Sequence, residues 1–503
     1  LRHDMKPYKS FLFLLVLLLI CSALAYNFRQ REMAIAEAQR IARERAEREQ
    51  FVLDSLDAVE RRFFLFDTAL FFRAELSTVP FRPFEYDTAL SEHPLAPLYT
   101  LLRYREDPDR FAAALMDFTN EWDDEPEPLI RILHYGDSQI ENDRISGSFR
   151  SYMQRAFGGA GRGLVSLNQN VQAHGLRMQK SKEWVEVSMV QEKRRGNYGL
   201  SGGYLTPPAI WFIQPLLRTA DYGHFRLDWN KPEGGAFVDV FVHEDVPARN
   251  LSWTVDARTE DGVSARVSAD TIPTEKTGFG LKRFRFAREE YEKSRDLRIR
   301  LSRNHNLYAV SFNDSTGICV DNLPYRGNSG YIFSPQQRAF LSESYRLADV
   351  KFIIYQFGAN LIPYNAVPAK TDSLRQAELA YYRRALLQEI TYLHTVAPTM
   401  PVCIVSIPPR PVDARRDMET EYDRRAALRV VYDIQREVAL ATGCVFWDLW
   451  ALTKDHPEWI SSDHIHFSDA GADMVGKMLY KSFITDYYRF VKAQEKAYDS
   501  RKP

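Results

Sequence analysis

The hydrophobic pattern of this 503-residue chain changes its period twice. Around residues 129–157, and again beyond residue 350, short apolar runs alternate with long amphipathic segments, a pattern typical of buried strands followed by helices. Between these regions the chain has short segments of alternating apolar and polar residues, separated by turn residues. The first pattern predicts a parallel α/β sheet and the second predicts antiparallel strands, so we expect one domain to be interrupted by another.

The two outer regions predict one α/β domain with a flavodoxin-like, doubly wound parallel sheet, assigned to residues 126–170 and 311–495. The expected strands are 129–135, 350–356, 402–407 and 444–448. The expected helices are 143–157, 373–394, 421–441 and 471–492. Because helices cover both faces of such a sheet, its strands should be apolar almost throughout, as these runs are.

The middle region, residues 171–310, predicts an inserted β-rich domain, an antiparallel sandwich or jelly roll. The expected strands are 184–190, 225–229, 236–243, 251–257, 263–269, 280–286 and 297–301. Five aromatic residues of this part of the chain are interpreted first as core residues, with stacking on a sugar ring as the alternative: Trp184, Tyr198, Tyr204, Trp211 and Trp229.

The first 26 residues predict export. An unbroken apolar run from Phe11 to Tyr26 follows two lysines, which is the pattern of a membrane anchor or of a signal peptide. Ala23 and Ala25 would suit cleavage before Tyr26, whereas an extra helical turn would allow the run to span a bilayer. We favour an uncleaved inner-membrane anchor, and both interpretations place the body of the protein outside the cytoplasm.

Two further segments precede the α/β domain. Residues 27–60 predict a charged helical stalk, since Arg and Glu recur four residues apart, as in Arg40 and Glu44. Residues 61–125 predict a helical lead-in whose phenylalanines, such as Phe63 and Phe64, pack on the body.

Composition excludes several classes of protein. The net charge of −1 argues against a nucleic-acid binder, and the basic cluster Lys193–Arg195 is interpreted as a solvated turn. Four cysteines are too few for a disulfide scaffold, and we expect Cys319, Cys403 and Cys444 to be buried free thiols. The sequence contains no metal-ligand motif, so neither a metal nor a cofactor is expected.

Two motifs follow predicted strands at the edge of the sheet where open α/β folds bind ligands. Gly136–Gln139 follows the first strand, and a serine at such a turn can expose its hydroxyl to a substrate. Gly358–Asn360 follows the strand 350–356, and the asparagine amide can donate a hydrogen bond to an oxyanion. Each motif taken alone is also compatible with an ordinary turn.

Two further motifs complete the set. Asp321–Gly330 is interpreted as a loop whose glycine lets a backbone N–H approach an oxyanion. In Asp463–His466 a carboxylate precedes an imidazole by three residues, so that one tight turn can point both side chains the same way. The carboxylate would orient the ring, and the far ring nitrogen would accept the proton of a serine.

In this order the four motifs resemble the four blocks of the SGNH hydrolase superfamily, the GDSL-like esterases and lipases. The resemblance implies that Ser138 is the nucleophile and His466 the base, with Asp463 orienting His466. His464 is the competitor for the role of base and is interpreted as an exposed neighbour.

The resemblance also implies an oxyanion hole. Its donors would be the backbone N–H groups of Ser138 and Gly327 and the side chain of Asn360, with Gly330 as the competitor for Gly327. Two residues depart from the family pattern: Gln139 stands where the name-giving leucine is found, and Arg326 precedes the glycine where asparagine is frequent.

The insertion between the first two blocks resembles that of exported bacterial peptidoglycan O-acetylesterases, in which a carbohydrate-module-like β domain interrupts the hydrolase. The resemblance implies a periplasmic or extracytoplasmic serine esterase that removes O-acetyl groups from an acetylated cell-envelope glycan. Two alternatives stay open. One is transfer of the acyl group to a glycan together with a membrane-bound O-acyltransferase partner, and the other is an inactive glycan-binding protein.

Overall fold

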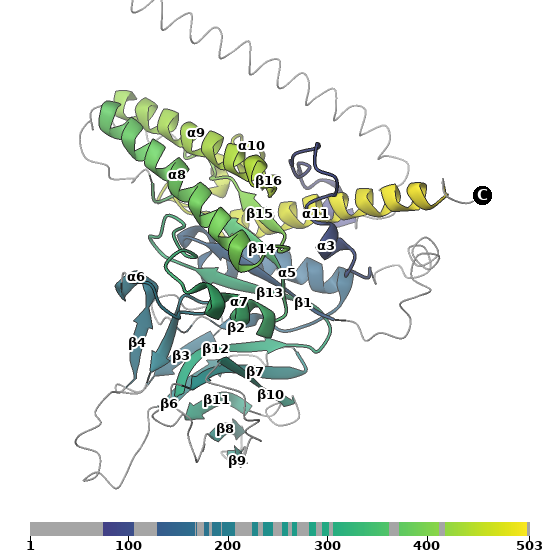
Figure 1. The fold of residues 1–503 in the computed structure, drawn as a ribbon, viewed down its shortest axis with the longest axis vertical. Helices are drawn as coiled ribbons and strands as arrows, with labels where there is room; N and C mark the ends of the chain where they lie inside the picture. Colours follow the sequence, from purple (N-terminus) through teal and green to yellow (C-terminus); the bar gives the residue numbers. More distant parts are fainter. Residues whose placement is uncertain are drawn as a thin grey trace, which may run out of the picture. The chain divides into compact units, whose positions relative to one another are not determined.

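Figure 1 shows the chain as a computed structural model. The structure describes residues 74–104, 128–165, 167, 176–180, 184–192, 194–206, 224–229, 235–244, 254–259, 264–268, 281–287, 294–300, 305–361, 372–411 and 418–499. Of the first compact unit, residues 1–78, these include helix α2 (Ala74–Ser77). The predicted anchor and stalk lie outside the described residues. Within the described residues, no helix is both long and apolar enough to cross a membrane.

The second compact unit, residues 79–503, begins with an irregular segment rather than with the predicted helical lead-in. The described residues 79–104 contain one short helix, α3 (Ala96–Tyr99), so the prediction of helix is wrong for this stretch. Prolines remove backbone donors and fix φ, which prevents a continuous helix here. These prolines are Pro80, Pro83, Pro94 and Pro97.

The predicted parallel sheet is present. Its strands lie in the order β13-β1-β14-β15-β16, and each pairs in parallel with its neighbours. The bounds are β1 (Leu129–Gly136), β13 (Gly317–Pro324), β14 (Val350–Gln356), β15 (Val402–Val405) and β16 (Val445–Trp447). Counted along the chain this is the order 2-1-3-4-5, which confirms the flavodoxin-like expectation.

Helices cover both faces of the sheet, as Figure 1 shows. The helical elements of this domain are η2 (Ser138–Asp143), α5 (Arg144–Phe157), α7 (Arg338–Leu347), α8 (Asp372–Val396), α9 (Met418–Ala441), α10 (Leu449–Thr453), η4 (Pro457–Trp459) and α11 (Asp469–Asp499). Phe352 of β14 points to Phe483 of α11, with ring centroids 6.2 Å apart. Its neighbour Ile353 is buried in one cluster with Leu386 of α8. Successive side chains of one strand therefore pack on opposite layers.

Strand β13 was not predicted. The sequence interpretation placed Asp321–Gly330 in a loop, which is wrong for Asp321–Pro324, because these residues end β13 and pair with β1. Polar Asp321 and Asn322 hide the strand from a hydrophobicity pattern. Both are buried, and their side chains find partners on neighbouring elements.

Between α5 and β13 the chain forms two antiparallel sheets, as the alternating pattern predicts. The six-stranded sheet contains β2 (Gly163–Val165), β4 (Val185–Ser188), β5 (Gly203–Thr206), β7 (Phe237–Glu244), β10 (Leu281–Ala287) and β12 (His305–Asn313). The five-stranded sheet contains β3 (Leu176–Lys180), β6 (His224–Trp229), β8 (Thr254–Thr259), β9 (Ser264–Ser268) and β11 (Ser294–Arg300). A short helix, α6 (Met189–Glu192), follows β4. Strand β2 lies before the predicted bounds 171–310, and β12, with which it pairs, extends past them. The jelly-roll topology stays a prediction.

The core prediction holds for Trp184 and Tyr198, whereas Tyr204 is half-buried and packs against the core. Trp184 and Tyr198 are each 2% exposed and are therefore core residues, whereas Trp211 and the side chain of Trp229 lie outside the described part of the chain. The thiols of Cys319, Cys403 and Cys444 are free and buried, as expected.

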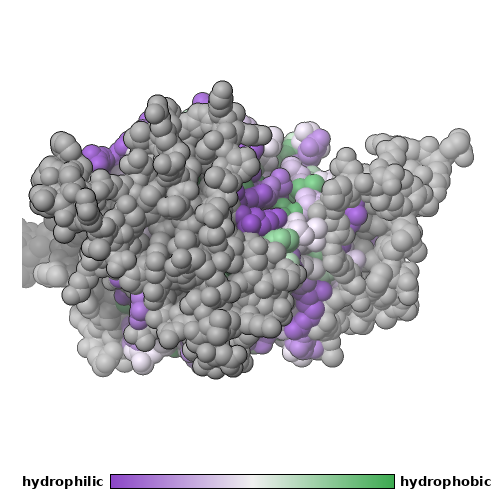
Figure 2. Space-filling model, turned by 90° about the horizontal axis from the view of Figure 1, so that it is seen from below, coloured by the Kyte–Doolittle hydropathy of each residue, from purple (hydrophilic) through white to green (hydrophobic). Residues whose placement is uncertain are grey.

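Figure 2 shows one face on which the described residues are hydrophilic and hydrophobic side by side. On the described surface, the exposed large hydrophobic side chains come from several parts of the chain, with two of them in α8: Leu90, Val185, Val190, Tyr381, Leu387 and Val430.

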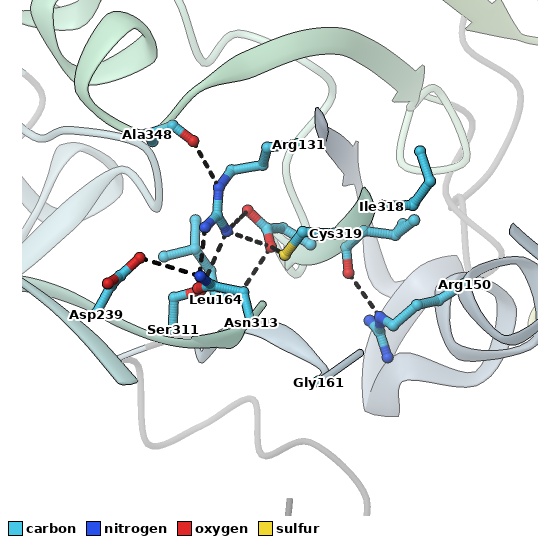
Figure 3. A network of polar contacts seen from close by, with 12 residues as sticks. Arg131, Arg150, Gly161, Leu164, Asp239, Ser311, Asn313, Ile318, Cys319 and Ala348 are labelled. Carbon is cyan, nitrogen blue, oxygen red and sulfur yellow. Dashed lines mark hydrogen bonds and ion pairs between the residues drawn. The ribbon is translucent and has the colours of Figure 1, made fainter. Parts of the chain in front are cut away.

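A buried ion pair lies where the parallel sheet meets the inserted strands (Figure 3). The guanidinium of Arg131 in β1 donates to both carboxylate oxygens of Asp321 in β13 at 2.8 Å, and neither side chain is exposed. Arg131 also donates to Ser311 and Asn313 of β12, at 3.1 and 3.2 Å. On the other side, Asp321 accepts a hydrogen bond of 2.9 Å from the backbone N–H of Leu164 in β2. The pair therefore joins two core strands to two inserted strands.

We expect Asp321→Asn to lower the free energy of unfolding by about 3–5 kcal/mol, because it leaves the buried guanidinium of Arg131 without a counter-ion. Urea unfolding followed by circular dichroism measures this loss. The matched control is Glu343→Gln, which removes the exposed pair between Glu343 and Arg346 and should cost less than about 1 kcal/mol. Equal losses in the two variants would contradict the proposed contribution of the buried pair to the free energy of unfolding.

Candidate active site

The turn after β1 brings Ser138 to the carboxyl end of the sheet. The carboxylate of Asp137 caps η2 by accepting the backbone N–H of Gln139 at 3.0 Å, and it also accepts that of Ala359 at 3.1 Å. A side chain at Gly136 would meet the carbonyl of Gln356 at 2.9 Å, so glycine lets β1 and β14 approach closely here. Asp137 therefore ties the motif that contains Ser138 to the motif that contains Asn360.

The turn from Ser461 to His466 brings a carboxylate and an imidazole to Ser138. His466 Nε2 lies 2.7 Å from Ser138 Oγ, and His466 Nδ1 lies 2.6 Å from Asp463 Oδ2. The second carboxylate oxygen of Asp463 accepts the Ser461 hydroxyl and the backbone N–H groups of Ile465 and His466, at 2.7, 2.8 and 2.9 Å. Asp463, His466 and Ser138 thus form one continuous chain of hydrogen bonds.

The charge of Asp463 is stabilised by its own turn. Partial burial alone would raise the pKa of its carboxyl, but the hydrogen bonds from Ser461, from the ring and backbone of His466 and from Ile465 lower the pKa well below its usual range. Asp463 therefore stays ionised and can stabilise an imidazolium on His466.

The structure separates the two histidines of this turn. His466 contacts Ser138, whereas His464 occupies the left-handed region with φ of 59° and donates its backbone N–H to the Ser461 carbonyl at 3.0 Å. The structure therefore brings together the three residues predicted as the triad. Their catalytic role stays a prediction.

The two candidate glycines have different surroundings. Gly327 is exposed, has φ of 74°, and an added Cβ would have no atom within 4 Å. Gly330 is buried with φ of 105°, and an added Cβ would collide with the hydroxyl of Tyr355. Gly330 is therefore needed for close packing, whereas a side chain at position 327 would point into open space.

Asn360 holds the same loop. Its Nδ2 donates to the carbonyl of Asn328 at 3.0 Å, and the Asn328 side chain accepts the backbone N–H of Gly330 at 2.6 Å. Because an amide nitrogen carries two hydrogens, this contact uses one of the two that Asn360 can donate. Its role as an oxyanion donor, like that of Gly327, stays a prediction.

Arg326, which departs from the family pattern, forms an ion pair with a neighbouring side chain. Its guanidinium makes two hydrogen bonds of 2.5 Å with the carboxylate of Glu141, which lies in η2 three residues after Ser138. The Glu141 side chain is 9% exposed and that of Arg326 is 63% exposed. This bidentate pair fixes the loop that contains Gly327 against the turn that contains Ser138.

Asp137 is the buried ionisable group next to the triad. Desolvation raises the pKa of its carboxyl to about 6, although the hydrogen bonds from Gln139 and Ala359 and the nearby charges of His466 and Arg410 act in the opposite direction. Asp137 was present in the first motif but was not among the predicted site residues. Its role follows from burial and cross-strand contacts, which the sequence does not show.

The arrangement suits acyl transfer through a serine. A hydroxyl, a base that can remove its proton and a carboxylate that orients the base are aligned at the carboxyl end of a parallel sheet. Within the described residues, no cluster of His, Cys, Asp or Glu could hold a metal ion. The parallel sheet and the line of Asp463, His466 and Ser138 are the arrangement expected of an α/β serine hydrolase.

Comparison with known proteins finds one matching family and one similar fold. Residues 298–474 match the GDSL-like Lipase/Acylhydrolase family, a segment that includes His466 but not Ser138, which precedes the inserted strands. A solved peptidoglycan O-acetylesterase covers 78% of this chain and 99% of its own, with 18% identity and a TM-score of 0.52. Residues 298–474 therefore match a GDSL-like lipase/acylhydrolase domain, and the fold of the chain resembles that of a peptidoglycan O-acetylesterase.

Two further solved structures have low TM-scores. A carbohydrate acetylesterase from Sinorhizobium meliloti is 12% identical, covers 33% of this chain and 79% of its own, and has a TM-score of 0.24. A salicylyl-acyltransferase from a tetracycline biosynthetic pathway is 10% identical, covers 62% and 98%, and also has a TM-score of 0.24. Likeness at this level carries no argument about this chain. No curated protein matches the sequence.

We expect Gly330→Ala to lower the free energy of unfolding by at least about 3 kcal/mol, because it adds a collision with Tyr355 to an unfavourable φ. Gly327→Ala should cost only about 1–2 kcal/mol, because its added methyl group meets open space. Urea unfolding of both variants measures the difference. Similar losses would argue against the distinction between the two glycines.

The raised pKa of the Asp137 carboxyl predicts that the free energy of unfolding depends on pH. Because its pKa in the folded state is raised to about 6, the folded protein binds a proton between pH 4 and 6 that the unfolded chain has released. The free energy of unfolding of the wild type, relative to Asp137→Asn, should therefore fall by about 3 kcal/mol as the pH rises through this range. Urea unfolding at several pH values measures it, and parallel curves for the two proteins would contradict it.

Proposed function

We propose that this chain is an exported serine esterase that removes O-acetyl groups from a cell-envelope glycan, with peptidoglycan as the substrate class. The observation that carries the proposal is the hydrogen-bond chain from Asp463 through His466 to Ser138. Such a chain activates a hydroxyl that is otherwise a weak nucleophile at neutral pH.

In the first step Ser138 Oγ attacks the carbonyl carbon of the ester, and its proton passes to His466 Nε2. The imidazolium forms next to the ionised Asp463, which stabilises it. When the tetrahedral intermediate collapses, the bond between the carbonyl carbon and the sugar oxygen breaks. His466 returns the proton to that oxygen, which leaves an acetyl group on Ser138 and a free sugar hydroxyl.

The negative charge of the intermediate needs donors that are in place before the reaction. The backbone N–H groups of Ser138 and Gly327 and the second N–H of Asn360 are the proposed donors. Their support comes from the loop, because Asn360 binds the Asn328 carbonyl and Arg326 binds Glu141, so that the loop is held to both neighbouring motifs. Preorganised donors of this kind are worth about 10²–10³ in rate each.

In the second step water attacks the acyl carbon while His466 takes its proton. The bond to Ser138 Oγ breaks, acetate leaves and the proton returns to the serine oxygen. If a sugar hydroxyl replaced the water, the same intermediate would transfer the acetyl group. The choice between hydrolysis and transfer is therefore a choice of acceptor, and an experiment has to compare the two products.

The substrate class is supported by the likeness in fold to a peptidoglycan O-acetylesterase, which extends over 99% of that chain. Export is supported by the apolar run at residues 11–26. The buried Trp184 and Tyr198 are core residues and give no support to sugar stacking. The proposal for the substrate therefore depends on the fold and on the site rather than on the predicted aromatic residues.

We expect Ser138→Ala to lower the release of acetate from O-acetylated peptidoglycan by at least about 10³-fold, because removal of the nucleophile leaves only the binding groups. The measurement is acetate release together with mass spectrometry of the muropeptides, with a second glycan added as acetyl acceptor. Full activity of Ser138→Ala would exclude the acyl-serine route, and acetylated acceptor without free acetate would identify a transferase.

The two histidines provide a matched pair of controls. His466→Ala should lose activity as Ser138→Ala does, because His466 Nε2 lies 2.7 Å from Ser138 Oγ, whereas His464→Ala should retain it. A fluorophosphonate probe should label the wild type and His464→Ala but not Ser138→Ala. Failure to label the wild type would indicate an inactive, glycan-binding protein.

A further inference from the structure

The turn that contains Ser138 also binds the backbone on both sides of His466. Gln139 Nε2 donates to the carbonyl of Ile465 at 2.7 Å, and a guanidinium nitrogen of Arg144 donates to the carbonyl of Phe467 at 2.8 Å. The two acceptors are the residues immediately before and after His466. Two side chains that follow the nucleophile by one and six positions thus contact the backbone next to the candidate base.

The hydrogen bond from Gln139 to Ile465 has an unusual cost in stability. Gln139 is 2% exposed, and its Oε1 is buried with no hydrogen-bond partner among the described residues. A carbonyl only accepts, so the amide must turn its nitrogen to Ile465, which leaves its oxygen without a partner among the described residues. An unpartnered buried acceptor costs about 1–3 kcal/mol, which a leucine at this position would avoid. The amide therefore stabilises the contact with Ile465 at the expense of overall stability.

The contact of Arg144 is oriented by its own turn. Arg144 Nε donates to the carbonyl of Glu141 at 3.1 Å, and the guanidinium also lies 3.7 Å from the exposed carboxylate of Asp469. The Asp469 carboxylate is 94% exposed, so solvent screens this ion pair and it adds little. Arg144 is therefore held mainly by its two backbone acceptors, the carbonyls of Glu141 and Phe467.

The turn that contains His466 has hydrogen bonds of its own, including one from the Ser461 N–H to the His466 carbonyl at 2.7 Å, and the external contacts add to them. The side chains of His466 and Asp463 are 29% and 46% exposed, so burial does little to hold them. Phe467 is fully buried and anchors the following residue, whereas Ile465 is only half-buried. A shift of about 1 Å in a catalytic group can cost about 10²-fold in rate.

We propose that Gln139 and Arg144 are positioning residues that clamp the backbone on either side of His466 and so hold its ring over Ser138. The inference rests on the proposed function, since it assigns the clamp to the base of that mechanism. It also accounts for glutamine at the position where related sequences have leucine. In this chain the residue after the nucleophile connects two catalytic turns instead of filling the core.

The central variant is Gln139→Leu, which keeps the volume of the side chain and removes both the donor and the unpartnered oxygen. We expect kcat to fall about 10-fold with KM within about 2-fold, because the base is displaced while the glycan contacts are unchanged. The rate of fluorophosphonate labelling of Ser138 should fall with kcat. The melting temperature should equal or exceed that of the wild type, because the buried unpartnered oxygen is gone.

Arg144→Met and Arg144→Lys test the second contact. We expect Arg144→Met to lower kcat, and Arg144→Lys to recover part of the loss because an ammonium group can still donate to Phe467. In the double variant Gln139→Leu/Arg144→Met the loss in kcat should exceed the product of the two single losses, because either contact alone still restrains His466.

The outcomes separate the clamp from the proposed function. If Ser138→Ala keeps wild-type activity, the proposed function fails and the clamp fails with it. If Ser138→Ala is inactive while Gln139→Leu has wild-type kcat, only the clamp is overturned. If Gln139→Leu loses kcat together with its melting temperature, the residue supports the fold rather than His466, and the clamp is overturned as well.

Discussion

The ion pair between Arg131 and Asp321 joins the two strands from which the site is built. Strand β1 leads to Ser138 and β13 leads to the loop that contains Gly327, so their relative position sets the geometry of both. The same two side chains also bind inserted strands β12 and β2. A buried charge is tolerated only when it is paired and hydrogen-bonded, so the inserted strands and the core strands have to be in register for either part to be stable. The insertion thus shares its polar core with the domain that it interrupts.

The turn after β1 organises the remainder of the site. Besides the serine it provides Glu141, which binds the loop containing Gly327, and Gln139, which binds the turn containing His466. Asp137 closes the arrangement by binding the backbone at Ala359, next to Asn360. Three loops that are distant in the sequence therefore meet on one turn. This allows a compact α/β domain to accept a large insertion between its first and second motifs without losing the geometry of the site.

The site also contains the polar groups that cost stability. Asp137 is buried with a pKa raised by desolvation, and Gln139 buries an oxygen without a partner among the described residues. Neither group is needed to build the sheet, which is held by apolar residues on both faces. Costs of this kind gather at functional sites, where a residue serves the geometry of a reaction rather than the stability of the fold. Their position around Ser138 agrees with a catalytic role for this edge of the sheet.

The sequence alone determined the parts of this protein that depend on local patterns. Apolar periodicity predicted strands β1, β14, β15 and β16 with their helices, and the motif order predicted Ser138, Asp463 and His466 as partners. Strand β13 was not predicted, because Asp321 and Asn322 are residue types that are common in loops. Their partners in the structure, Arg131 and Ser146, are distant in the sequence or on another element. The resemblance had favoured His466 over His464 and Gly327 over Gly330, and the tertiary structure gave each choice a physical reason. Only the tertiary structure gave Gln139 and Arg326 their partners. The reason is physical: a hydrophobic period is a property of neighbouring residues, whereas a hydrogen bond across hundreds of residues exists only after the chain has folded.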